Sequence, residues 1–72
     1  MVKARVTFPH FYPEGSLGHN DVTAREGHYI EANNKYELEK KLCDMVLKEK
    51  KSIDVQDWPS GKNLTRISPV VM

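Results

Sequence analysis

A chain of 72 residues is long enough for one small domain, residues 1–72, with a single thin hydrophobic core. Its 11 basic and 10 acidic side chains give a net charge of +1, which argues against a dedicated nucleic-acid-binding protein. One cysteine excludes an internal disulfide, and the sequence shows neither a signal peptide nor a long apolar run. We therefore expect a complete, cytoplasmic protein that does not enter a membrane.

Residues 2–8, VKARVTF, alternate between apolar and polar side chains. One face would carry Val2, Ala4, Val6 and Phe8, and the other would carry Lys3, Arg5 and Thr7. A period of two with one polar face predicts a strand that is half buried. Pro9 ends this strand because proline cannot donate a ladder hydrogen bond.

Residues 9–20 are rich in proline and glycine and predict a loop, whose aromatic side chains either form a recognition tip or close the core. Residues 21–32 predict a second strand, antiparallel to the first, with a bulge or bend at Gly27. His28, Ile30 and Ala32 would share its inner face, and Tyr29 and Glu31 would share its outer face.

The segment 32–51 predicts a helix of about four turns. The Asn34 side chain can accept a hydrogen bond from a backbone N–H of the first turn. Glu37 follows three residues later, as in a capping box. The apolar arc of this helix comprises Tyr36, Leu38, Leu42, Cys43, Met45, Val46 and Leu47. It is wider than the usual stripe of about 100°, so part of it would meet solvent or a second copy of the chain. The sequence does not decide whether the protein is a monomer or a homodimer.

Ile53 and Val55 indicate a short strand or an extended connection, and residues 58–63 have the composition of a turn. Residues 63–68 predict the last strand. Its inner face could carry either Thr65 and Ile67 or Leu64 and Arg66, and the sequence does not decide between these two pairs. The terminal residues 70–72 would trail or pack on the core. These elements predict an α+β fold in β-β-α-β order, with a small antiparallel sheet of three or four strands. One helix would cover one face of this sheet, and the other face would meet water.

No group of residues in the sequence has the pattern of a catalytic or metal site. His10, His19 and His28 lack the ligand spacing of a zinc site, so we predict no metal and no cofactor. Cys43 falls in the apolar arc of the predicted helix, where a cysteine usually acts as a small core hydrophobe. We predict no catalytic residue and do not expect an enzyme.

The polar face of the predicted sheet is the candidate binding surface. It would present Lys3, Arg5, Tyr29, Glu31 and Arg66. Arginine makes bidentate contacts with carboxylates, so such a face suits an acidic patch on a larger protein. We therefore predict these residues as partner-binding residues.

The end of the chain resembles a known family. The element order, Ala32 just before the capped helix, and LTRISPVV near the C-terminus are similar to the small phage-encoded inhibitors of bacterial host RNA polymerase. The resemblance covers about forty C-terminal residues, and the matching motif is Thr65-Arg66-Ile67-Ser68-Pro69. Ser68 stands where the family has a second arginine, and the segments 9–20 and 51–63 are longer than in the family.

This resemblance implies a β-β-α-β fold and binding to the jaw of the polymerase β′ subunit, which blocks transcription from host promoters. Arg66 would be a polymerase-contacting arginine, and the protein would act in the host cytoplasm. Two other functions stay open. One is nucleic-acid binding through Lys3, Arg5, the aromatic loop and the lysines at 48–51. The other is inhibition of a host defence nuclease complex.

Overall fold

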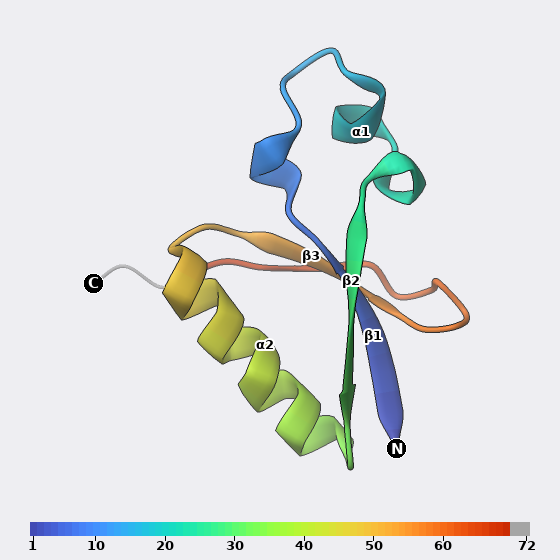
Figure 1. Cartoon of the computed structure of the whole chain (residues 1–72), viewed down its shortest axis with the longest axis vertical. Coiled ribbons are helices and arrows are strands. Elements are labelled where there is room, and N and C mark those ends of the chain that lie inside the picture. The colour runs from blue at the N-terminus through green and yellow to red at the C-terminus, as the bar shows by residue number, and fades with distance from the viewer. Residues whose placement is uncertain (70–72) are drawn as a thin grey trace.

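The computed structural model describes residues 1–69, and the expectation for residues 70–72 lies outside the described residues. Four strands and one long helix form the body of the domain (Figure 1). Their bounds are β1 (Val2–Thr7), β2 (Gly27–Ala32), α2 (Lys35–Glu49), β3 (Ile53–Asp57) and β4 (Thr65–Ile67). Between β1 and β2 lie two 3₁₀ turns, Pro9–Phe11 and Val22–Ala24, and the short helix α1 (Leu17–Asn20).

The strands form one antiparallel sheet in the order β2-β1-β3-β4. Ala4 lies opposite Ile30 of β2, and Val6 lies opposite both His28 of β2 and Val55 of β3. The central strands β1 and β3 are largely buried, whereas the edge strands β2 and β4 are more exposed. The predicted fold class is confirmed, and the uncertain fourth strand is β3, which lies in the middle of the sheet.

One face of the sheet packs against α2 and forms the hydrophobic core. The apolar side chains of β1 and β3 meet Leu38, Leu42 and Val46, which recur every four residues along the helix. The buried set is Ala4, Val6, Phe8, Ala32, Leu38, Leu42, Val46, Ile53 and Val55. Ile67 is partly buried against it, which resolves the open question about β4: Ile67 faces the helix side.

The helix begins as its sequence predicts. The Asn34 side chain accepts a hydrogen bond from the Glu37 N–H at 2.9 Å. The Glu37 carboxylate accepts in return from the Asn33 N–H at 3.3 Å. At the other end Lys50 adopts the left-handed conformation and its N–H bonds the Val46 carbonyl, which closes the last turn.

The predicted apolar arc of the helix is only partly buried. Tyr36 is 77% exposed, Leu47 is 62% exposed, and Cys43 is also exposed. The prediction that Cys43 is a core residue is therefore wrong. The reason is geometric, because a single helix lying on a sheet buries one narrow stripe, and here Leu38, Leu42 and Val46 occupy it.

The second strand is shorter than predicted, because only Gly27–Ala32 belong to it. The Asp21 carboxylate accepts hydrogen bonds from the N–H and the hydroxyl of Thr23, which favours a 3₁₀ turn over an extended strand. Gly27 lies in regular register opposite Thr7 and forms no bulge. The last strand is also shorter, since Thr65–Ile67 pair with β3.

The far face of the sheet differs most from its prediction. We expected it to meet water, but Arg5, Thr7, Asp54 and Gln56 are between 0% and 7% exposed. The connection between β1 and β2 supplies Arg25, which is also buried and bonds to this face. The far face is therefore a second, polar interior beside a smaller exposed area.

Candidate functional site

The sheet register brings the predicted partner-binding residues onto one face. Lys3 lies opposite Glu31, and Arg5 lies opposite Tyr29. Arg66 of β4 lies opposite Asp54 of β3, on the same face as Arg5. We call the exposed part of this face the sheet-face surface, and it comprises Lys3, Tyr29, Glu31, Trp58 and Arg66.

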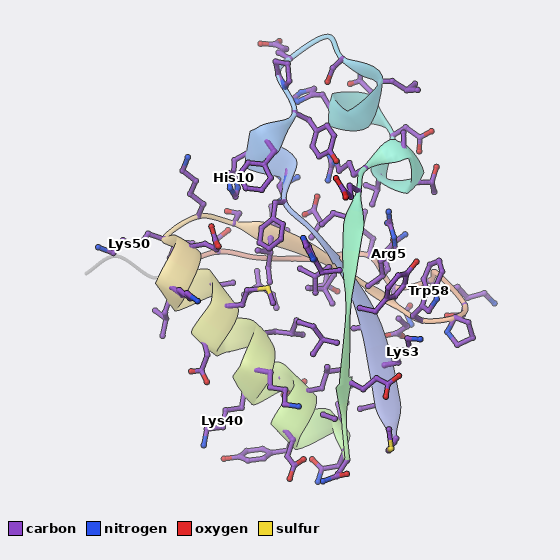
Figure 2. The ribbon with its side chains drawn as sticks, in the orientation of Figure 1. Lys3, Arg5, His10, Lys40, Lys50 and Trp58 are labelled. Carbon is purple, nitrogen blue, oxygen red and sulfur yellow. The ribbon has the colours of Figure 1, made fainter. Side chains whose placement is uncertain are left out.

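The sheet-face surface contains an aromatic pair. The Tyr29 ring lies against the Trp58 ring, with their centroids 5.4 Å apart, and Tyr29 is still 54% exposed. The Lys3 ammonium lies 5.1 Å from the centroid of the Tyr29 ring, within the range of a cation–π interaction. Figure 2 shows Lys3, Arg5 and Trp58 gathered on this side of the sheet.

Trp58 is a site residue that sequence reasoning missed, because it lies in a segment with the composition of a turn. Its backbone N–H donates to the Lys3 carbonyl at 3.2 Å, so the chain leaving β3 continues alongside β1. A large aromatic residue just before a proline turn was the available signal. Only the order of the strands places it next to Tyr29.

Lys3 and Glu31 form an exposed ion pair at the margin of the aromatic pair. The distance from Lys3 Nζ to Glu31 Oε1 is 3.7 Å, and the two side chains are 40% and 50% exposed. An exposed pair of this kind adds less than about 1 kcal/mol to stability. Both side chains can therefore exchange this contact for one with a partner.

Arg5 does not belong to the exposed surface, so the prediction that the polar sheet face presents it to a partner is wrong on exposure. Its guanidinium donates to Gln56 Oε1 at 3.0 Å, to the Val22 carbonyl at 3.4 Å and to the Arg25 carbonyl. A Cβ at Gly27 would lie 2.5 Å from Arg5 Nε, so glycine there makes room for the side chain. Arg5 is 7% exposed and ties the connection between β1 and β2 to the sheet.

Two arginines converge on one buried carboxylate. Asp54 accepts from Arg25 Nη1, and it also accepts two hydrogen bonds from Arg66, at 2.8 Å and 3.1 Å. The Asp54 and Arg25 side chains are 3% and 4% exposed, whereas the Arg66 side chain is 59% exposed. The buried Asp54 carboxylate thus orients the Arg66 guanidinium and leaves much of the Arg66 side chain accessible to solvent. Neither Arg25 nor Asp54 was predicted, because an acidic residue between Ile53 and Val55 has the pattern of the solvent-facing side of a strand.

The two arginines set the charge of Asp54. Burial raises the pKa of the Asp54 carboxyl, but the hydrogen bonds from Arg66 and Arg25 outweigh burial and hold this pKa below its ordinary value of 3.8. The same contact with Asp54 raises the pKa of Arg66. Asp54 is therefore ionised at neutral pH and carries a full negative charge between the two guanidinium groups.

Protonation of Asp54 at low pH should lower the free energy of unfolding. Its pKa is lower in the folded chain than in the unfolded chain, so its stabilisation is present above about pH 4 and is lost as the pH falls further. We expect the difference in unfolding free energy between wild type and Asp54→Asn to shrink from pH 6 to pH 2 in urea titrations. Glu31→Gln is the control, with a small difference at each pH. A constant difference for Asp54→Asn would contradict the assignment.

Other candidate sites are weaker. Among residues 1–69, no three side chains of the His, Cys, Asp and Glu types are grouped so that they could hold a metal ion. In the same range, no helix combines the length and the apolar character needed to cross a bilayer. A groove of about 790 Å³ is lined by residues of α2, β1, β3 and β4 and of the turn after β3, with Leu38, Leu42, Val55 and Ile67 among them.

The chain matches no family model, no curated protein and no solved structure. The resemblance of residues 65–69 to phage inhibitors of RNA polymerase therefore stays a prediction.

Proposed function

We propose that this chain is a small non-enzymatic binding module that docks on a larger protein through the sheet-face surface and inhibits or redirects that protein. The observation that carries the proposal is the aromatic pair, in which Trp58 supports Tyr29 while Tyr29 stays 54% exposed. Large side chains that are ordered before binding lose little entropy on association, and aromatic residues are common interface anchors.

The exposed charges of the sheet-face surface favour a protein partner. Lys3 and Arg66 are positive and Glu31 is negative, and each of these side chains is at least 40% exposed. A partner with both signs of charge can pair with all three, whereas a phosphate backbone would be repelled by Glu31. The net charge of +1 agrees with this choice.

Bacterial RNA polymerase is the first target that we propose, on the strength of the TRISP segment. Under this proposal the chain is a phage-type protein that acts in the host cytoplasm, and Arg66 contacts an acidic patch of the polymerase. The bidentate contact with Asp54 supports this role, because it holds the exposed guanidinium in one orientation. Arg66→Glu would be a poor test, since it would place a carboxylate beside Asp54 and disturb the fold as well.

Tyr29→Ala is expected to weaken binding to purified bacterial RNA polymerase by about 2 kcal/mol, or roughly thirtyfold, because it removes the exposed ring of the aromatic pair. Biolayer interferometry with immobilised polymerase measures this change. Tyr36→Ala is the matched control, since Tyr36 is an exposed tyrosine on α2, away from the sheet-face surface.

The two parts of the proposal can fail separately. If the wild-type chain does not bind the polymerase and does not reduce promoter-dependent transcription in vitro, the polymerase is not the target. If it binds and Tyr29→Ala binds equally well, the sheet-face surface is not the contact.

Binding of single-stranded nucleic acid is a second candidate, favoured by the aromatic pair Tyr29–Trp58 with Lys3 beside it. Trp58 is the single tryptophan, so its fluorescence reports on this surface directly. Salt-sensitive quenching by an oligonucleotide would support this function over the first. Unchanged fluorescence at low salt would dismiss it.

A further inference from the structure

A second surface feature lies where the end of β1 approaches the start of β2. It is a pocket of about 320 Å³, lined by Phe8, Phe11, Tyr12, Glu26 and His28. It shares no residue with the sheet-face surface. Its ligand is therefore a separate question from the partner proposed above.

The pocket is built from aromatic rings in contact with one another. The Phe8 ring lies 5.5 Å from the Phe11 ring and 5.4 Å from the His28 ring, centroid to centroid. Phe8 is 7% exposed and anchors the group in the core, whereas Phe11 is 65% exposed. His10 packs edge-on against Phe11, with ring centroids 4.3 Å apart, and supports it from outside the pocket lining.

Tyr12 is also held in place before any ligand binds. Its hydroxyl accepts a hydrogen bond from the Glu26 backbone N–H at 2.6 Å. Its ring packs on the backbone at Gly18, where a Cβ would overlap the ring. This bond connects Tyr12 to the backbone of Glu26, so the Tyr12 ring is held in position beside the residue that supplies the carboxylate.

The chemistry of this lining selects a cation. The faces of aromatic rings carry partial negative charge, and Glu26 adds a carboxylate. Among the described residues that line the pocket there is no lysine or arginine to repel a positive ligand. A quaternary ammonium group suits such a site, because it is weakly hydrated and large enough to contact several rings at once.

We propose that this pocket binds a methylated, quaternary ammonium group. Phe8, Phe11 and Tyr12 supply the aromatic contacts, and Glu26 supplies the opposite charge. The group enters beside Phe11, which is 65% exposed.

Titration with choline, followed by NMR of the ¹⁵N-labelled full chain, tests the proposal. We expect saturable shifts of the Phe11, Tyr12 and His28 amides. The neutral isostere 3,3-dimethylbutan-1-ol should bind at least about tenfold more weakly, because it has the same shape without the charge. Equal binding of the two compounds, or no shift with choline, would overturn the proposal.

Variants of exposed residues locate the site without threatening the fold. Phe11→Ala and Glu26→Gln should each weaken choline binding by at least about threefold, and Tyr36→Ala should leave it unchanged. Unchanged binding in both pocket variants would also overturn the proposal. Nα-acetyl-Nε-trimethyl-lysine amide then identifies the carrier. Tighter binding than choline assigns the site to a methylated lysine, and equal or weaker binding assigns it to a free headgroup.

Discussion

Asp54→Ala is expected to lower the free energy of unfolding by about 3–5 kcal/mol. The Arg25 side chain is 4% exposed, and without Asp54 its charge would be buried with no partner of opposite sign among residues 1–69. Because small domains have only about 5–15 kcal/mol of stability, the loss should be visible as a large fall in the urea midpoint. Far-UV circular dichroism during urea titration measures it.

The control for this change is Glu31→Ala, which removes the acidic partner of the exposed pair with Lys3. We expect it to cost less than about 1 kcal/mol, because both side chains are well solvated. Similar losses in the two variants would mean that the Arg25–Asp54–Arg66 cluster is not the centre of the polar interior.

Ile53→Ala is expected to lower the free energy of unfolding by about 2–5 kcal/mol, because it leaves a cavity in the core. Ile53 is 0% exposed, lies in the central strand β3 opposite Ile67, and belongs to the core under α2. The same urea titration measures the loss. The m-value should stay unchanged if the folded state keeps its compactness.

Leu47→Ala is the matched control for Ile53→Ala, since it also shortens a large aliphatic side chain. Leu47 is 62% exposed on the outer side of α2, so the expected change is within about 0.5 kcal/mol. A large loss in Leu47→Ala would show that this side of the helix is buried in solution, as it would be in a homodimer.

These variants separate the two interiors of the domain. The apolar interior under α2 includes Ile53, and the polar interior on the far face includes Asp54, the next residue along β3. Successive residues of a strand point to opposite faces, so one strand serves both. The polar interior holds Arg66 and the connection between β1 and β2 in place, and the proposed binding surface lies beside it.

Much of the fold could be predicted, because its signals are local. The alternation in residues 2–8, the Asn34 cap and the apolar residues at helical spacing each depend on neighbours a few positions away. Strand ends were less predictable, because the Asp21 side chain competes for the backbone and shortens β2.

Less of the candidate site could be predicted. Alternation placed Lys3, Tyr29 and Glu31 on the polar face, and the observed register agrees. It could not show that Arg5 is buried, since that depends on the carbonyls of Val22 and Arg25 arriving from another segment. Trp58 was missed for a similar reason, because its neighbour Tyr29 lies two strands away in the sheet.

By itself the sequence determined the element order, the capped helix and the two-sided character of the first strand, since periodicity and capping act within one or two turns of chain. The tertiary structure decided which charges are buried and which are free. Arg25 meets Asp54 across 29 positions and Arg5 meets Gln56 across 51, and only the strand order β2-β1-β3-β4 brings them together. Charges that are far apart in sequence can satisfy one another only after the sheet has formed, and no local pattern encodes that choice.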